Sequence, residues 1–175
     1  MYGNLRKIVS LNKEAFMKIL LLYYSYGGNT HRAARHIQKI LGCDVQEILT
    51  VTPYSGDYNS VVSQGKREVE EGYEPPVRPF DKDLDHYDTV ILGTPVWWYT
   101  FAPAVKTVLN AADWNGKTVY PFATNGGWIG HTFRDMKTAC AGADVKQGLN
   151  IRFDGDQMQT SIAEIDRWTA EIKEE

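Results

Sequence analysis

Short hydrophobic segments alternate with amphipathic segments along most of the chain. Five hydrophobic segments predict β-strands, at residues 18–24, 43–49, 88–93, 118–124 and 148–153. The first and third are continuously apolar, which is typical of strands covered on both faces. The second and the last alternate between apolar and polar residues, which indicates strands nearer a sheet edge.

The segments between these strands carry apolar residues at helical spacing. Pro103 is well placed for the first turn of one such helix. The four sets are Ala33, Ala34, Ile37, Ile40 and Leu41; Ala104, Val105, Val108, Leu109 and Ala112; Phe133, Met136 and Cys140; and Ile162, Ile165, Trp168 and Ile172. Strands that alternate with helices predict an α/β fold, in which helices cover both faces of a parallel sheet.

The crossover at residues 50–85 has no simple strand-to-helix pattern. It contains a candidate helix at residues 58–69, which Gly72 and the following prolines would end. The residues at helical spacing are Tyr58, Val61, Val62, Gly65 and Val69. Two roles stay open for this segment: a wall of a substrate pocket, or an extra helix packed on the sheet. The acidic segment 80–88 has no histidine or cysteine ligand pair, and we interpret it as a solvated approach to the third strand rather than a metal site.

Composition narrows the class of protein. A chain of 175 residues, 43% of them hydrophobic, is long enough for one domain with its own core. The formal net charge of -3, without any basic run, argues against nucleic-acid and membrane-surface partners. Cys43 and Cys140 are the only cysteines and form no CxxC pattern, which favours a cytoplasmic protein with reduced thiols. No stretch approaches the roughly 20 apolar residues of a membrane-spanning helix.

Residues 1–16 are predicted to be an extension without a chemical role. They carry charges in the middle and lack the apolar stretch and the small-residue cleavage site of a signal peptide. Strand-like sequence begins at a second methionine, Met17. We therefore place the functional domain at residues 17–175.

A polar turn that contains two glycines follows the first predicted strand. Residues 24–31 read YSYGGNTH and lead into the first predicted helix. A helix N-terminus offers unpaired N–H groups and partial positive charge, and adjacent glycines let the backbone approach an anion closely. Ser25, Asn29 and Thr30 add polar side chains around it. The turn therefore predicts a phosphate site, and an ordinary Asn or Thr helix cap is the alternative.

Missing motifs narrow the kind of phosphate compound. The turn lacks the GxxxxGK[ST] pattern of nucleoside-triphosphate sites and the GxGxxG pattern of dinucleotide sites. It has no cysteine for a phosphatase, and no aspartate ends the first or third strand as a phospho-acceptor. Without lysine or arginine in the turn, a bound phosphate keeps much of its negative charge, which suits a cofactor of low redox potential.

Two further loops are expected at the same edge of the sheet, where ligands bind in folds of this kind. The loop 93–103 reads GTPVWWYTFAP, and its Trp97, Trp98 and Tyr99 favour stacking on a planar aromatic ligand over core packing. A hot spot for a protein partner is the alternative. The loop 123–131 reads ATNGGWIGH, and its glycines permit close backbone approach to a ligand.

In combination and in order, these motifs resemble those of the flavodoxin family over residues 17–173. The matching segments are YYSYGGNT at 23–30, GTPVWW at 93–98 and FATNGGWIGHTFRDM at 122–136. The resemblance implies a flavodoxin-like three-layer sandwich, with a five-stranded parallel sheet of order 2-1-3-4-5 and helices on both faces. It also implies FMN as the cofactor.

The resemblance further implies which residues contact each part of FMN. The phosphate would be held by Ser25, Tyr26, Gly27, Gly28, Asn29 and Thr30. The isoalloxazine would be lined by Thr94, Pro95, Val96, Trp97 and Trp98, with Tyr99 beside them. The pyrimidine edge would be closed by Asn125, Gly126 and Gly127. Two positions depart from the family pattern: Gly27 stands where threonine is frequent, and Tyr99 stands where many relatives have glycine.

Two functions of different classes follow from that cofactor. One is an electron carrier that docks on redox partner proteins, and the other is an NAD(P)H-dependent FMN oxidoreductase that reduces quinones or similar small acceptors. We favour electron transfer and leave the reductase open. No catalytic side chain is required, although Tyr99, Trp128 and His131 are candidates to orient a substrate or donate a proton. An interaction module of the same fold without FMN is a third class.

Overall fold

Five parallel strands form the body of the sheet in the computed structural model, which describes residues 18–174. The predicted extension at residues 1–16 lies outside the described residues. The strands are β1 (Ile19–Tyr23), β2 (Asp44–Glu47), β3 (Thr89–Trp97), β5 (Thr118–Asn125) and β7 (Leu149–Asp154). Their spatial order is β2-β1-β3-β5-β7, which confirms the predicted order 2-1-3-4-5.

Three short strands that the sequence did not predict extend this sheet. β4 (Thr100–Phe101) pairs antiparallel with β3, and β8 (Gln157–Met158) pairs antiparallel with β7. β6 (Asp144–Val145) pairs parallel with the start of β5. Two residues are too few for an apolar pattern to be recognised, because a half-buried strand shows itself over about four to eight residues. The sheet is therefore mixed rather than purely parallel.

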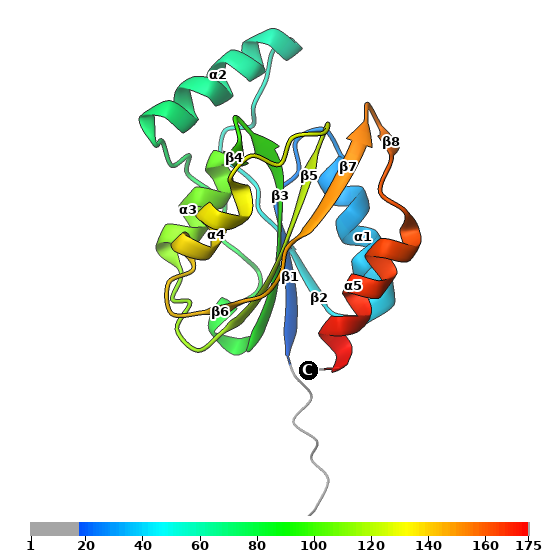
Figure 1. Cartoon of the computed structure of the whole chain (residues 1–175). Coiled ribbons are helices and arrows are strands. Elements are labelled where there is room, and N and C mark those ends of the chain that lie inside the picture. The colour runs from blue at the N-terminus through cyan, green and yellow to red at the C-terminus, as the bar shows by residue number, and fades with distance from the viewer. Residues whose placement is uncertain (1–17, 175) are drawn as a thin grey trace, which may run out of the picture.

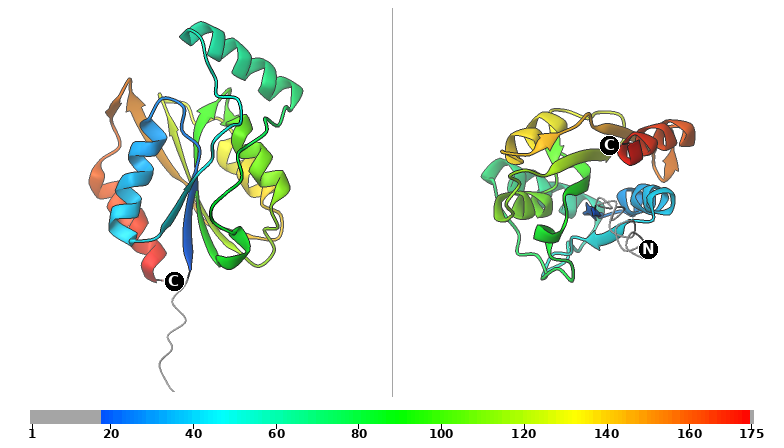
Figure 2. Two further views of the ribbon diagram at one scale, coloured as in Figure 1. Left: turned by 180° about the vertical axis from the view of Figure 1, so that it is seen from behind. Right: turned by 90° about the horizontal axis from the view of Figure 1, so that it is seen from below.

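Helices cover both faces of the sheet (Figure 1, Figure 2). α1 (Asn29–Leu41) and α5 (Ile162–Glu174) lie side by side on one face, and α3 (Pro103–Ala111) and α4 (Thr132–Ala139) lie on the other. Pro103 begins α3, where its missing N–H costs nothing. The predicted helices and the three-layer arrangement are confirmed.

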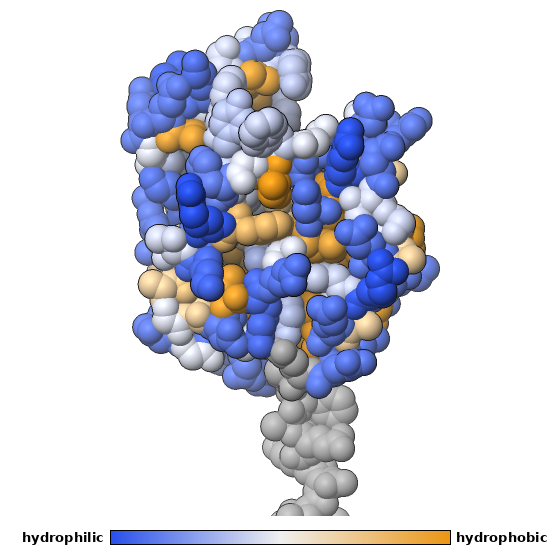
Figure 3. Space-filling view, viewed as in Figure 1, coloured by the Kyte–Doolittle hydropathy of each residue, from blue (hydrophilic) through white to orange (hydrophobic). Residues whose placement is uncertain are grey.

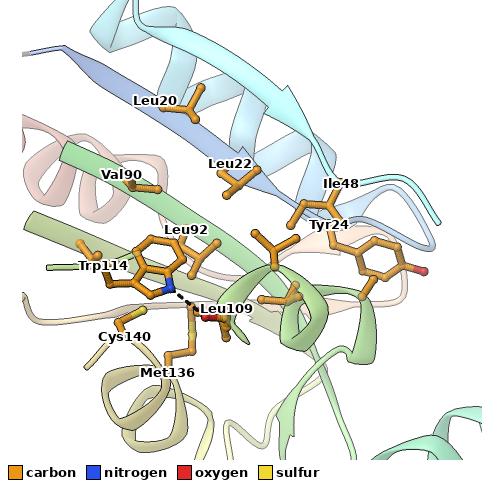
Figure 4. Packing of buried hydrophobic residues seen from close by; sticks show 14 of the residues in the cluster. Leu20, Leu22, Tyr24, Ile48, Val90, Leu92, Leu109, Trp114, Met136 and Cys140 are labelled. Atoms are coloured by element: carbon orange, nitrogen blue, oxygen red, sulfur yellow. Dashed lines mark hydrogen bonds between the residues drawn. The ribbon is translucent and has the colours of Figure 1, made fainter. Parts of the chain in front are cut away.

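Alternate residues of the central strands enter two hydrophobic clusters, one on each face of the sheet. Leu20 and Leu22 of β1 belong to the cluster beneath α3 and α4, whereas Leu21 belongs to the cluster beneath α1 and α5. Burial on both sides explains why this strand is continuously apolar. In the first cluster, the indole N–H of Trp114 donates a 2.9 Å hydrogen bond to the carbonyl of Leu109 (Figure 4).

The candidate helix of the crossover is α2 (Tyr58–Glu71), which Asp57 caps and Gly72 ends. It does not lie on a face of the sheet but stands above the carboxyl edge (Figure 1). The segment that follows α2 contains the 3₁₀ turn Leu84–His86 and packs Val77, Phe80 and Leu84 against the first cluster. The irregular part of the crossover therefore covers part of the sheet, and α2 stands beside the carboxyl edge of the strands instead.

Hydrogen bonds between side chains and backbone fix the chain beyond α2 to α3. Lys106 Nζ donates to the carbonyl of Gly72 over 2.7 Å, and the Thr107 hydroxyl donates to the carbonyl of Pro75 over 2.8 Å. α2 is thus anchored at its C-terminal end. Between residues 18 and 174, no helix combines the length and the apolarity needed to cross a membrane.

Candidate functional site

The turn between β1 and α1 presents an uninterrupted run of free main-chain donors. Within the described chain, the N–H groups of residues 25–30 have no protein acceptor, and the first bonded amide is that of His31, which donates to Ser25 Oγ over 3.1 Å. The N-cap of α1 is Gly28, at φ +89°, which has no side chain to cap the helix, and Ser25 Oγ accepts a first-turn amide from outside the helix. The alternative of an Asn or Thr cap is therefore wrong. Unpaired amides at a helix start are able to bind an anion.

Two side chains of this turn, unlike its amides, form hydrogen bonds within the protein. Thr30 is buried, and its hydroxyl bonds that of Thr124 over 2.7 Å. Asn29 Nδ2 donates to the carbonyl of Gly155 over 2.9 Å and so joins the turn to the β7–β8 hairpin. A Cβ on Gly27 or Gly28 would meet nothing within 4 Å, so the space above these two residues is open. The candidate donors of this turn are its unpaired amide N–H groups and the hydroxyl of Ser25, which accepts the His31 N–H and keeps its own proton.

The second loop is shorter than the sequence indicated, because β3 continues to Trp97. Trp98 and Tyr99 alone make the turn into β4, at φ +49° and +70°. Two-residue turns with positive φ at both positions normally use Asn-Gly, so two aromatic residues here cost on the order of 1–3 kcal/mol each. Thr94 is fully buried, and its hydroxyl accepts the N–H of Ala102 over 3.1 Å. Thr94 therefore supports the loop from below.

The expectation that Trp97 lies in a loop with no core to enter was wrong. Its ring packs edge-on against three tyrosines, with centroid distances of 4.9 Å to Tyr54, 6.1 Å to Tyr24 and 5.9 Å to Tyr26. A Cβ at Gly65 of α2 would lie 2.9 Å from the Trp97 ring. Tyr24 belongs to the first hydrophobic cluster, and Tyr54 and Trp97 pack against it. The cluster therefore extends to α2, which the strand pattern did not reveal.

A buried carboxylate holds this aromatic cluster, defined as Tyr24, Tyr26, Tyr54 and Trp97. Glu68 of α2 is 7% exposed and accepts hydrogen bonds from the Tyr54 hydroxyl at 2.5 Å and from Gln64 Nε2 at 2.7 Å. Burial, followed by the hydrogen bond to Glu68, raises the pKa of Tyr54 well above its ordinary value. The Tyr54 hydroxyl is thus a fixed donor.

The third loop is locked to the second through the backbone of Tyr99. The N–H of His131 donates to the Tyr99 carbonyl over 2.8 Å, and the rings of Tyr99 and Trp128 meet edge-on at 6.0 Å. A Cβ at Gly130 would lie 2.3 Å from the Tyr99 carbonyl oxygen, so only glycine fits there. Asn125 Oδ1 accepts the N–H of Gly127 over 2.9 Å and shapes the start of this loop.

Asp135 of α4 orients one titratable group at the mouth of this loop. Its Oδ2 contacts Nδ1 of His131 and accepts the Thr100 hydroxyl over 2.7 Å. Nε of Arg134 forms an ion pair with Oδ1 of Asp135 over 3.5 Å. The His131 side chain is 45% exposed, and the contact at Nδ1 leaves its Nε2 as the free ring nitrogen. Across residues 18–174, no group of three or more His, Cys, Asp or Glu residues is arranged to hold a metal ion.

A pocket of about 190 Å³ opens beside the first two loops. Tyr26 of the first turn and Trp97 and Trp98 of the second loop form one side, and α2 forms the other with Tyr58 and Val62. The sequence left open whether the crossover walls a pocket, and the structure answers that it does. Gly65 was the available signal, since a glycine on the apolar stripe of a helix often marks a close approach.

The structure brings the residues named from the sequence to one edge of the sheet. Figure 3 shows a largely hydrophilic face with a notch at the top, between α2 and the β7–β8 hairpin. Tyr26, Gly27 and Gly28 are exposed, as are Trp98, Tyr99, Gly126 and Gly127; Thr30 and Thr94 are buried, and Ser25, Asn29, Pro95, Val96, Trp97 and Asn125 are half-buried. Tyr54, Gly65 and Glu68 belong to the same region and were not named as site residues.

These features define a doubly wound α/β protein whose first turn can hold an anionic group beside aromatic side chains. The chain belongs to the flavodoxin family, whose model matches residues 18–169. No curated protein matches the chain.

Solved structures share this fold over nearly the whole chain. A candidate flavoprotein from Bacteroides eggerthii is 28% identical, with a TM-score of 0.75, and the match covers 89% of this chain and 98% of that one. A second, from Bacteroides uniformis, is 26% identical, with a TM-score of 0.76 and coverage of 88% and 98%. A Lactobacillus acidophilus flavoprotein in complex with FMN is 24% identical, with a TM-score of 0.68 and coverage of 87% and 99%, and this likeness concerns the fold alone.

Proposed function

We propose that this protein binds FMN and transfers electrons through it. The observation that carries the proposal is the run of six consecutive amides, residues 25–30, that no group in the described chain accepts. Main-chain N–H groups at a helix start suit a phosphate dianion. The open space above Gly27 and Gly28 gives that group room. A family relationship to flavodoxins and a fold shared with an FMN-bound flavoprotein support the same cofactor.

The residues present fit the remaining parts of FMN. In this proposal the isoalloxazine lies against the exposed rings of Trp98 and Tyr99, and Gly126 brings its main-chain N–H to the pyrimidine edge. Asn125 and Gly127 close that edge through the turn in which Asn125 Oδ1 accepts the Gly127 N–H. Trp98 and Tyr99 are 38% and 51% exposed, so both rings present surface on which a planar ring can stack. When bound, FMN supplies the redox chemistry. The chain's own residues hold it, keep its phosphate charge uncompensated and shield one side of the ring.

Electron transfer to partner proteins is the function we favour. Such a carrier needs an exposed flavin edge and no catalytic side chain, and the notch between α2 and the β7–β8 hairpin leaves that edge open (Figure 3). The proposed partners are redox proteins or NAD(P)H. The proposed compartment is the cytoplasm, because Cys43 and Cys140 are both free thiols.

A second candidate function is NAD(P)H-dependent reduction of a small acceptor. The observation that favours it is the pocket beside the loops, together with His131, whose Nδ1 is held by Asp135. An imidazole fixed by a carboxylate at one nitrogen presents its other nitrogen in a defined direction, as proton donors in enzymes do.

FMN uptake tests the first proposal. Titration of FMN into the cofactor-free protein should quench flavin fluorescence at micromolar concentrations. The Gly28→Val variant puts a β-branched residue at φ +89° and closes the space over the amides. Gly42→Val is the matched control, because Gly42 ends the same helix at φ +66° and also has nothing within 4 Å.

The two variants carry similar backbone strain, so their stabilities should fall alike. FMN affinity should fall at least about tenfold in Gly28→Val, an effect of about 1.4 kcal/mol, and stay near the wild-type value in Gly42→Val. Equal affinity in both variants would show that the first turn does not hold the phosphate. If the wild type does not take up FMN, the proposed function is wrong, and an interaction module without a cofactor is the remaining hypothesis.

Anaerobic addition of NADH or NADPH to the FMN-loaded protein separates carrier from enzyme. Prompt bleaching of the flavin absorbance supports the reductase. A stable spectrum that bleaches only after a partner reductase is supplied supports the carrier.

A further inference from the structure

We infer that Tyr54 is a redox-active tyrosine, which gives up one electron through the aromatic cluster while Glu68 accepts its proton. The pair would act as a sink for oxidising equivalents that reach Trp97 and Trp98 of the second loop. Every group that this function needs belongs to the chain itself. The inference therefore goes beyond the proposed function and does not depend on FMN.

The rings of the aromatic cluster form a continuous path from the surface to Tyr54. Tyr26 is 42% exposed, and the centre of its ring lies 5.9 Å from that of Trp97. The Trp97 and Tyr54 centroids are 4.9 Å apart, closer than any other pair of rings in the cluster. Rings at such distances are in direct contact. An electron can therefore pass between Trp97 and Tyr54 without crossing a gap.

Tyr54 has a base on its hydroxyl group. Oxidation makes a phenol strongly acidic, so a tyrosine loses an electron most readily where a group stands ready to take its proton. The Tyr54 hydroxyl donates to Glu68 Oε2 over 2.5 Å. Among residues 18–174, Glu68 is the only acidic residue that is buried. Because burial and this hydrogen bond raise the pKa of Tyr54, the phenol keeps its proton until the electron leaves.

Packing alone does not require a negative charge at Glu68. A glutamine there would offer Tyr54 the same kind of acceptor oxygen and would lose far less hydration on burial. The two donors that bond Glu68, Tyr54 and Gln64, are both neutral. Lys106 lines a small pocket together with Glu68, but its ammonium donates to the carbonyl of Gly72. A base for the phenol proton explains why a carboxylate stands in this costly position.

The proposed step balances in electrons, protons and charge. A one-electron oxidant of the radical class takes an electron from the Trp97 ring. Tyr54 then supplies one electron to Trp97, and its O–H bond breaks as the proton moves to Glu68 Oε2. The products are a neutral tyrosyl radical and a neutral carboxylic acid, so the buried pair loses its negative charge. A one-electron reductant such as ascorbate later restores the phenol, and the proton returns from Glu68.

Pulse radiolysis of the cofactor-free protein tests the inference, with azide radicals as the one-electron oxidant. Azide radicals oxidise tryptophan, and time-resolved absorption follows the decay of the tryptophanyl band and the growth of the tyrosyl band. Tyr54→Phe removes the proposed final electron donor. Glu68→Gln keeps an acceptor oxygen for the Tyr54 hydroxyl but removes the base. Circular dichroism confirms that each variant is folded.

Tyr87→Phe is the matched control, because Tyr87 is also buried and also donates to a carboxylate. Its hydroxyl bonds Asp44 Oδ2 over 2.7 Å, but Asp44 is exposed. Tyr87 precedes β3, whereas Trp97 is the last residue of that strand. The two tyrosines thus lie at opposite edges of the sheet, and only Tyr54 contacts the Trp97 ring.

The wild type and Tyr87→Phe should show a fast transfer of oxidation from tryptophan to tyrosine. Tyr54→Phe should lose this fast phase. Glu68→Gln should slow it at least about tenfold, an increase of about 1.4 kcal/mol in the barrier. The wild-type transfer should also be slower in heavy water, because the proton moves with the electron.

Two results would overturn the inference. An unchanged fast phase in Tyr54→Phe would mean that oxidation ends on another residue. An unchanged rate in Glu68→Gln would mean that the carboxylate only positions the Tyr54 ring. Neither result bears on the proposed function, because no FMN is present in the experiment.

Discussion

Replacement of Gly130 by alanine tests how the second and third loops are held together. The new Cβ would lie 2.3 Å from the carbonyl oxygen of Tyr99 and 2.6 Å from its Cα. Both are backbone atoms of a turn that already has two residues at positive φ, so neither can swing aside as a flexible side chain would. The third loop must therefore retreat, and the hydrogen bond from the His131 N–H to the Tyr99 carbonyl must lengthen or break.

Three contributions add to the expected loss of stability. Alanine at φ +60° costs about 1–2 kcal/mol relative to glycine. Loss of the hydrogen bond to Tyr99 costs about 1 kcal/mol. Forced separation of packed groups costs at least about 1 kcal/mol more. We expect the free energy of unfolding to fall by about 3 kcal/mol or more in Gly130→Ala.

Gly116→Ala is the matched control for the backbone contribution. Gly116 has φ +73°, but a Cβ there would meet nothing within 4 Å. This variant should lose only about 1–2 kcal/mol. Urea unfolding followed by circular dichroism measures both losses, and FMN titration should show weaker binding in Gly130→Ala alone. Equal destabilisation of the two variants would refute the reasoning, because the contact with Tyr99 would then carry no energy.

Two further predictions concern buried groups away from the loops. Tyr54→Phe leaves the buried Glu68 carboxylate with one hydrogen-bond donor fewer, so the free energy of unfolding should fall by about 2 kcal/mol. Tyr58→Phe, at an exposed ring, is the control and should cause almost no change. Similar losses in both variants, measured by urea unfolding, would contradict this. Burial raises the pKa of the Cys140 thiol from 9.0 to about 12 and that of the half-buried Cys43 thiol to about 11. Iodoacetamide at pH 8 should therefore modify neither thiol quickly, and rapid labelling detected by mass spectrometry would contradict the raised pKa values. Because folding favours the protonated thiol of Cys140, its contribution to stability is complete below pH 9 and is lost as the pH rises towards 12.

Much of the fold followed from local patterns in the sequence. The continuous apolar runs at β1 and β3 and the alternation at β7 report directly how many faces of each strand are covered. Helices such as α1 and α3 show one apolar stripe because each has one buried face. The two-residue strands β4, β6 and β8 gave no such signal, because their pairing depends on neighbours that the local sequence does not name.

The candidate site was predicted less completely than the fold. The glycines and the polar residues of the first turn indicated an anion site, since donors at a helix start are a local property of the chain. The role of Thr30 was not readable, because its hydroxyl is taken by Thr124, 94 residues away in sequence. Trp97 was assigned to a loop, because nothing local shows that α2 stands over it.

By itself, the sequence determined the five long strands, the helices and the edge of the sheet at which the candidate site lies, because hydrophobic periodicity and turn residues act over a few neighbouring positions. Only the tertiary structure decided where α2 stands, that Tyr54 and Glu68 brace the aromatic cluster, and that Tyr99 locks two loops together. These features join segments tens of residues apart. Their energies come from packing and hydrogen bonds that exist only once the chain has folded.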